Sequence, residues 1–297
     1  MTPTTPRDAQ IAATPVPATG RGLSVIVPAH NSVATIGRCL AAVVESAVPR
    51  DLPVDVVIAA NGCTDATVEI AESFAPRFEA RGWALRVLDL PQRGRIAALN
   101  AGDAAAQGRL RAYLDADVKV SKPLLGQIIT ALDRDAPTYA SGHLRIPRPT
   151  TAASRAYRRF YLGMPVVAQG APGCGFFAVN AAGRARWDSF PEVIADDMFA
   201  RLNFAPNERI GVPAGYDRPL VEGWSRLVQV RRRQDAGAAE IARRFPDLVA
   251  NEDKPRAGIG ALLQRAAADP AAFAVYAGVA GAGRLGPRGG QGRSHSR

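Results

Sequence analysis

Leu23-Ser24-Val25-Ile26-Val27 is a short, mostly β-branched run of residues that stops at Pro28. An apolar run of this length, ended by a proline, predicts a buried strand of a parallel sheet. Asn31 and Ser32 follow as candidate helix caps, and apolar residues then recur on one helical face as far as Val44. The stretch therefore predicts a strand that leads directly into a helix.

The same alternation of strand and helix continues through the first half of the chain. Further strands are expected at 54–59, 85–88 and 110–114, with helices beginning at about residue 65 and over 95–106. Such alternation predicts an α/β fold with a doubly wound, mostly parallel sheet that is flanked by helices. In the second half we expect helices at 122–134, 151–163, 195–204 and 223–243, and strands near 138–146, 174–179 and 209–213.

The two ends of the chain differ in composition from this core. Residues 1–21 are rich in Pro, Thr and Ala, which predicts a disordered leader. Residues 246–282 are rich in Ala and Leu, which predicts a helical C-terminal extension, and 283–297 are expected to form a flexible basic tail. The segment 271–282 is apolar but too short to span a bilayer. Contact of this segment with an anionic membrane surface is the alternative to a core helix.

The composition is that of a soluble globular protein, and it narrows the choice of partners. The net charge of +10 comes from clustered arginines, and the aromatic content of 6% includes no aromatic-plus-basic repeat, so we expect no nucleic acid partner. The three cysteines are scattered singly and form neither a metal knuckle nor a disulfide framework. Because no signal peptide or membrane-spanning run is visible, we expect a cytoplasmic location, with contact at the inner face of the membrane as the alternative.

Polar residues gather where the predicted strands end. In an open parallel sheet, ligands bind beyond the carboxyl ends of the strands, so residues that follow different strands meet at one edge. Three strand ends contribute candidate residues, namely Pro28, Ala29, His30 and Asn31 after the first, Asn61 and Asp65 after the second, and Asp115 and Asp117 after the fourth. The sequence therefore predicts a binding crevice at this edge.

Asp115 and Asp117 are the strongest candidates for metal binding in this group. Two carboxylates that face one crevice repel each other unless a cation lies nearby. Mn²⁺ and Mg²⁺ prefer oxygen ligands and often complete their shell with substrate phosphates. The alternative is that both residues are solvated loop acids, as in many isolated Asp-x-Asp triplets.

Four motifs in order resemble the inverting family 2 glycosyltransferases with the GT-A fold. The motifs are VIVPAHN at 25–31, NGCTD at 61–65, GRIAALNAG at 94–102 and AYLDADV at 112–118. The resemblance is close over about 23–120 and looser as far as about 243. It implies one GT-A domain over 22–245, with a nucleotide-binding half at 22–120 and an acceptor half at 121–245.

The resemblance also implies roles on the donor side. Pro28, Ala29 and His30 would line the nucleoside pocket together with Asn31. Asn61 would stand where relatives carry an acid that contacts the base, whereas Asp65 is either a donor contact or a helix cap. Arg95 replaces the usual lysine and would pair with the diphosphate or fix Asp115. Asp117 would bind the metal directly, with Asp115 nearer the ribose or a metal-bound water.

The acceptor half offers a candidate catalytic base. Asp196 and Asp197 resemble the Glu-Asp pair of the family, so Asp197 would be the base and Asp196 would replace the glutamate; the alternative is a helix N-terminal pair of acids. Gln229 and Arg232 resemble part of the Q-x-x-R-W motif of processive members, but Arg233 replaces the tryptophan. Arg232 would clamp the diphosphate, unless it belongs to a solvated charge run.

The expected activity is metal-dependent, inverting, non-processive transfer of one sugar. The donor would be a nucleotide-diphosphate sugar, and the acceptor a hydroxyl on a glycan, a lipid-linked molecule or a small molecule. One alternative is a nucleotidyltransferase of similar fold, which would usually show a glycine-rich phosphate loop after the first strand. Another is a non-catalytic nucleotide-sugar-binding protein. The sequence specifies neither the sugar, the base nor the acceptor.

Overall fold

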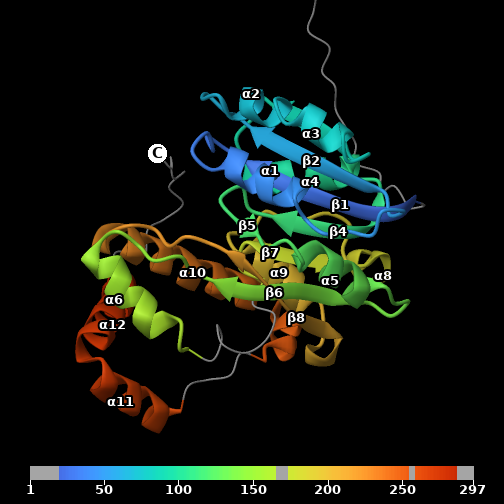
Figure 1. Ribbon diagram of the computed structural model, residues 1–297. Coiled ribbons are helices and arrows are strands. Elements are labelled where there is room, and N and C mark those ends of the chain that lie inside the picture. The colour runs from blue at the N-terminus through green and yellow to red at the C-terminus, as the bar shows by residue number, and fades with distance from the viewer. Residues whose placement is uncertain (1–19, 165–172, 254–257, 286–297) are drawn as a thin grey trace, which may run out of the picture.

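One mixed sheet runs through the part of the chain that the computed structural model describes, which is residues 20–164, 173–253 and 258–285 (Figure 1). Its strands are β1 (Gly20–Ala29), β2 (Val54–Asn61), β3 (Ala84–Leu90), β4 (Gly108–Leu114), β5 (Lys119–Val120), β6 (Tyr139–Arg145), β7 (Phe176–Val179) and β8 (Arg209–Asp217). Their order across the sheet is β3-β2-β1-β4-β7-β6-β8-β5. The residues 1–19 of the expected leader and 286–297 of the expected tail lie outside the described residues.

The first half forms the expected parallel block. Strand β1 lies between β2 and β4, and Val25 pairs with Val56 on one side and Ala112 on the other. The connecting helices are α1 (Ile36–Val44), α2 (Thr67–Glu72), α3 (Ala75–Glu79) and α4 (Arg95–Ala105). Strand β1 begins at Gly20 rather than at Leu23, because Gly20 still pairs with Gly108 of β4. The expected second helix is divided into α2 and α3, and Pro76 lies in the first turn of α3.

The second half adds strands of both directions. Strand β7 is antiparallel to β4 and β6, β8 is parallel to β6, and β5 is antiparallel to β8. Six of the eight described strands therefore point the same way, which confirms the mostly parallel sheet. The helical elements of this half are α5 (Leu124–Leu132), α6 (Ala152–Tyr161), α8 (Ala181–Arg184), α9 (Asp196–Leu202), η1 (Pro206–Glu208) and α10 (Trp224–Arg244).

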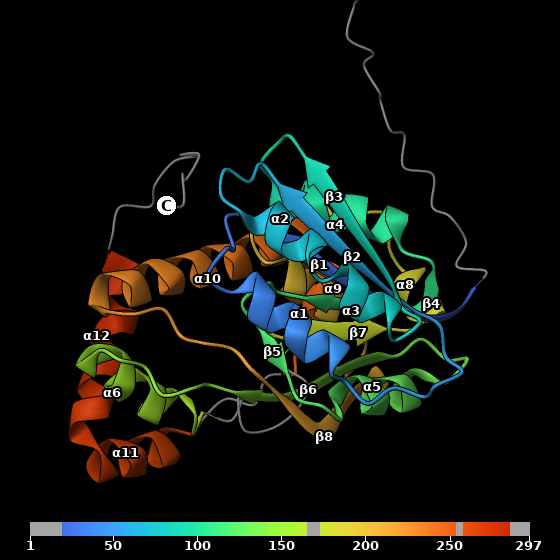
Figure 2. The ribbon, with the colours of Figure 1, turned by 45° about the horizontal axis from the view of Figure 1, so that its top comes forward.

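Helices cover both faces of the sheet, as a doubly wound fold requires. In β1, Val25 and Val27 face a core shared with α1, α3 and α5, and Figure 2 shows α1 and α3 over this face. The side chain of Ile26 points to the other face, where it packs with residues of α4 and α9. This alternation along one strand follows from the two-residue period of β structure. It explains why β1 reads as continuously apolar in the sequence.

The C-terminal extension packs onto the domain rather than standing apart from it. It consists of η2 (Pro246–Asn251), α11 (Ile259–Ala268) and α12 (Pro270–Leu285). Val279 of α12 is fully buried against Tyr157 of α6 and Leu227 of α10, and these helices lie together at one end of the sheet (Figure 1). Helix α12 reaches Leu285, so it continues into the expected tail. No helix in the described ranges has both the length and the apolar character needed to cross a bilayer.

Candidate active site

Asp115 directly follows β4, at the carboxyl edge of the parallel strands. Its backbone amide donates to the carbonyl of Gly175 (2.9 Å), which fixes the loop against the chain before β7. Its carboxylate accepts from Arg95 Nη2 at 2.7 Å and from Arg218 Nη2 at 3.4 Å, with one oxygen for each guanidinium. Burial raises the pKa of Asp115, but these two cations outweigh burial and the pKa is lowered. Asp115 is therefore ionised and held from two sides.

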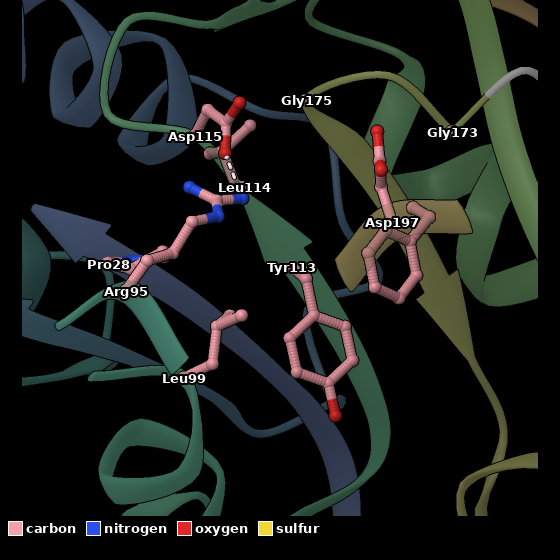
Figure 3. Close-up of a pocket in the computed structure, with 10 residues that line it drawn as sticks. Pro28, Arg95, Leu99, Tyr113, Leu114, Asp115, Gly173, Gly175 and Asp197 are labelled. Atoms are coloured by element: carbon pink, nitrogen blue, oxygen red, sulfur yellow. Dashed lines mark hydrogen bonds and ion pairs between the residues drawn. The ribbon is translucent and has the colours of Figure 1, made fainter. Parts of the chain in front are cut away.

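Arg95 connects this loop to α9 in the second half of the chain. It is the first residue of α4, and Gly94 before it donates its amide to the side-chain oxygen of Asn61 (3.2 Å). The Arg95 guanidinium also binds Asp196, with Nε at 2.9 Å from Oδ1 and Nη2 at 3.1 Å from Oδ2. Asp196 is only 4% exposed and begins α9. One guanidinium therefore bridges two carboxylates that lie far apart in the sequence. Figure 3 shows its contact with Asp115.

Asp197 lines the same small pocket as Arg95 and Asp115, as Figure 3 shows. Its Oδ1 accepts the backbone amide of Met198 at 2.8 Å. Burial raises the pKa of Asp197, and the neighbouring negative charge of Asp196 raises it further. A carboxylate of raised pKa in a pocket is suited to accept a proton from a bound group.

Asp117 is exposed, two residues beyond Asp115, and accepts no hydrogen bond from another described side chain. Surrounding protein atoms exclude part of the solvent and raise its pKa, and the charge of Asp115 adds to this effect. The described residues contain no group of three His, Cys, Asp or Glu side chains that could enclose a metal. One or two carboxylates suffice for Mg²⁺ or Mn²⁺, however, when substrate phosphates supply the other oxygens. The residues fit a cation shared with a donor diphosphate.

The ends of β1 and β2 meet as expected, and they are tied to each other. His30 Nδ1 lies 2.7 Å from the carbonyl oxygen of Asn61. The Asn61 amide group donates to the carbonyl of Ala29 at 2.7 Å, and its side-chain oxygen accepts from Gly94. Because Asn61 is only 5% exposed and its side-chain amide contacts both Ala29 and Gly94, it ties the ends of β1 and β2 to the start of α4.

Asn31 and Asp65 organise the loop beside these strand ends. Asn31 has a left-handed backbone (φ 46°), which is uncommon outside glycine, and its side-chain oxygen accepts the Thr64 amide at 2.9 Å. Asp65 accepts the backbone amides of Val33 and Thr67, both at 3.1 Å. These contacts give Asp65 a local role at the start of α2.

The structure does not bring Arg232 to this group of residues. Its guanidinium is exposed and donates to the carbonyl of Ala282 in α12 at 3.0 Å. The cation that does reach the site is Arg218, which directly follows β8. Sequence reasoning missed it because the strand was expected to end near residue 213, whereas β8 extends to Asp217. Its place at a strand's carboxyl end was the signal that could have found it.

Comparison with known proteins agrees with this architecture. The family model described as "Glycosyl transferase family 2" matches residues 24–200. A mannosyltransferase from Pyrobaculum calidifontis, solved with GDP-Man and Mn²⁺, is 24% identical and superimposes with a TM-score of 0.59, over 91% of this chain and 77% of that chain. This likeness confirms the GT-A fold.

Curated relatives show similarity over shorter regions. Glycosyltransferase AglE of Haloferax volcanii is 29% identical over 45% of this chain and 43% of its own length. The dolichyl-phosphate β-glucosyltransferase of Drosophila melanogaster is 32% identical over 42% and 39%, respectively. The dodecaprenyl-phosphate galacturonate synthase of Rhizobium johnstonii is 30% identical over 38% and 32%. The matches thus span less than half of each relative, whereas the family model spans more than half of this chain. The chain belongs to glycosyl transferase family 2.

Proposed function

We propose that this chain transfers one sugar from a nucleotide-diphosphate sugar to an acceptor hydroxyl, with inversion and with a divalent cation. The observation that carries the proposal is the pocket in which Asp197 faces Asp115 and Arg95 at the carboxyl edge of the sheet. Ligands of open α/β sheets bind at this edge. The mannosyltransferase of similar fold holds GDP-Man and Mn²⁺, which supports the same classes of donor and cofactor here.

In the proposed reaction, Asp197 takes the proton from the acceptor hydroxyl. The acceptor oxygen forms the new bond to the anomeric carbon while the bond from that carbon to the diphosphate oxygen breaks on the opposite face. Negative charge then develops on the leaving diphosphate. Arg95 and Arg218, which both contact Asp115, would provide positive charge next to it. Asp117, with Asp115 behind it, would hold the cation, which supplies further charge neutralisation when bound.

The proposed acceptor is a hydroxyl, and one other class of acceptor is an alternative to this proposal. A hydroxyl on a glycan or a small molecule fits an Asp base. The names of two relatives, a dodecaprenyl-phosphate and a dolichyl-phosphate enzyme, favour a lipid phosphate as the alternative. Membrane contact through 271–282 stays a prediction; Phe273 of this segment is 37% exposed, whereas Val279 is buried against α6 and α10.

The test is a screen of UDP, GDP and TDP sugars with Mn²⁺, Mg²⁺ or EDTA, in which released nucleotide and pyrophosphate are measured separately. We expect metal-dependent release of nucleoside diphosphate once a suitable acceptor is added. Pyrophosphate release instead would identify a nucleotidyltransferase, and donor binding without turnover would identify a non-catalytic binding protein.

The assignment of the base is tested with Asp197→Asn. This variant should bind the donor as the wild type does and lose transfer by about 100-fold or more, the usual contribution of a general base. Asp51→Asn, at an exposed loop position, is the matched control and should retain full activity. An Asp197→Asn enzyme with wild-type turnover would exclude Asp197 as the base.

A further inference from the structure

The geometry points to the Arg95–Asp196 pair as a positioning device that sets the base Asp197 relative to the donor. The inference rests on the proposed function, because it concerns how the two halves of that site are held in register. Arg95 contacts both Asp115, which directly follows β4, and Asp196 at the start of α9. Asp197, the next residue, faces the pocket. A movement of Asp196 therefore displaces Asp197 directly.

Asp196 is committed to this pair and is not available for proton transfer. Its side chain is buried, and its two oxygens lie 2.9 and 3.1 Å from two nitrogens of one guanidinium. This two-point contact fixes the orientation of the carboxylate as well as its distance. Asp196 is bound to Arg95, whereas Asp197 lines the pocket, so Asp197 is the acid of this pair that can meet a substrate.

Helix α4 makes a second contact with the region around α9, in addition to the Arg95–Asp196 pair. Asn100, which lies further along the helix, donates to the carbonyl of Phe190 at 3.0 Å and accepts the Phe190 amide at 2.8 Å. Helix α4 is thus linked to the chain just before α9 as well as to α9 itself. The N-terminus of α9 has no side-chain cap of its own. The Ile194 amide just before it donates to Glu240 at 2.8 Å, and the Arg95 contact fixes the Asp196 side chain.

An arginine is required for the double contact. Its planar guanidinium presents several N–H groups in fixed directions, so Nε and Nη2 bind Asp196 while Nη2 also reaches Asp115. Lysine offers a single ammonium point on a flexible stem. With Arg95→Lys, the two-point contact is lost, and the shorter side chain brings its ammonium to both carboxylates only if residue 196 is longer. Asp196→Glu adds one methylene to the side chain at position 196, which lets its carboxylate contact the shorter lysine side chain.

The experiment is a double-mutant cycle of Arg95→Lys and Asp196→Glu. Each single variant should lower kcat by about 10- to 100-fold, the effect of about 1 Å of misplacement, with donor KM changed by less than about 3-fold. The double variant should recover kcat to within about 3-fold of the wild type. Additive losses in the double variant, or a fully active Arg95→Lys enzyme, would overturn the inference.

A second readout does not depend on turnover. Amide hydrogen exchange over 196–202 should become faster in both single variants and return toward the wild-type rate in the double variant. If no donor is turned over by the wild type, the proposed function fails while this exchange pattern still tests the bridge. Unchanged exchange in the single variants would contradict it. Asp196→Asn, which keeps the shape and removes the charge, replaces Asp196→Glu if that variant does not fold, and faster exchange over 196–202 is again expected.

The matched control is the Arg159–Asp269 pair. It has the same two-point geometry, with Nε at 2.7 Å and Nη2 at 3.4 Å from the carboxylate oxygens, but it is half exposed and joins α6 to the residue before α12. Arg159→Lys should leave kcat and the exchange of α9 unchanged. A loss equal to that of Arg95→Lys would show a general sensitivity to arginine replacement and would overturn the inference.

Discussion

Gly175 sets the position of Arg218, so a single methyl group there should displace the cation. Gly175 has φ +79°, and a Cβ added to it would lie 2.7 Å from Arg218 Nε, closer than real Cβ atoms approach. The Arg218 side chain is 38% exposed, so it can yield by moving toward solvent, but that movement would weaken its 3.4 Å contact with Asp115. Gly175→Ala is therefore expected to disturb both the fold and the charge at the site.

The magnitude has two parts that a control separates. The left-handed backbone costs a non-glycine residue about 1–2 kcal/mol, and overpacking adds about 1–3 kcal/mol. Gly82 has φ +67° and no atom within 4 Å of an added Cβ, so Gly82→Ala carries the first cost alone. At about 2–4 °C per kcal/mol, the Tm of Gly175→Ala should lie several degrees below that of Gly82→Ala.

Activity gives the sharper assay. Loss of one preorganised cationic donor typically lowers kcat by about 100-fold or more. We expect this loss in Gly175→Ala, at a temperature where both variants are folded, and wild-type kcat in Gly82→Ala. Wild-type turnover in folded Gly175→Ala would refute the placement of Arg218 beside the reacting diphosphate. Equal Tm values for the two variants would refute the steric reasoning.

Three further outcomes follow from buried or titrating groups. The Tyr139 hydroxyl is buried and has no hydrogen-bond partner among the described residues, so Tyr139→Phe should raise the free energy of unfolding by about 1 kcal/mol in a denaturant titration; a decrease would reveal a partner. Because the pKa of Asp197 is raised and a base acts only when ionised, kcat should fall with decreasing pH at a value above the ordinary Asp pKa of about 4, and a limb at or below that value would contradict the assignment. The Glu222 carboxylate accepts from Thr150 and Thr151, which lowers its pKa to about 2. The ionised Glu222 carboxylate stabilises the folded state fully above its unfolded-state pKa of about 4.3, and this stabilisation is lost as the pH falls toward 2. Glu222→Gln should therefore have a lower Tm than the wild type at pH 7, and the difference should shrink between about pH 4.3 and about pH 2.

The sequence predicted the parts of the fold that local periodicity encodes. Apolar runs such as Leu23–Val27 identified the parallel strands, and their order placed Asp115 at the correct edge. The short β5 and α8 were missed, because two- and four-residue elements carry no measurable period. The direction of β7 also depends on pairing between distant segments, which no local pattern specifies.

The site was predictable where a residue's place followed from a strand or helix end. Asp115 was found in this way, whereas Asp197 and Arg95 came from the family resemblance, and the structure places all three in one pocket. Arg232 was expected at the diphosphate, but the contact of α10 with α12 turns its guanidinium toward Ala282. Which face of a helix meets the site is decided by tertiary packing, and the same packing decided that Arg218 takes part.

The burial of Val279 between α6 and α10 has a consequence for how the protein is made. Residues 152–161 and 224–244 leave the ribosome before 270–285, so during synthesis their apolar faces have no cover. The aromatic rings of Tyr157 and Phe160 lack their packing partner until Tyr276 is synthesised. In the folded protein, the ring centroid of Tyr276 lies 4.8 Å from that of Phe160. The sheet can form before α12 is synthesised, but the apolar faces of α6 and α10 are covered only after α12 has been made.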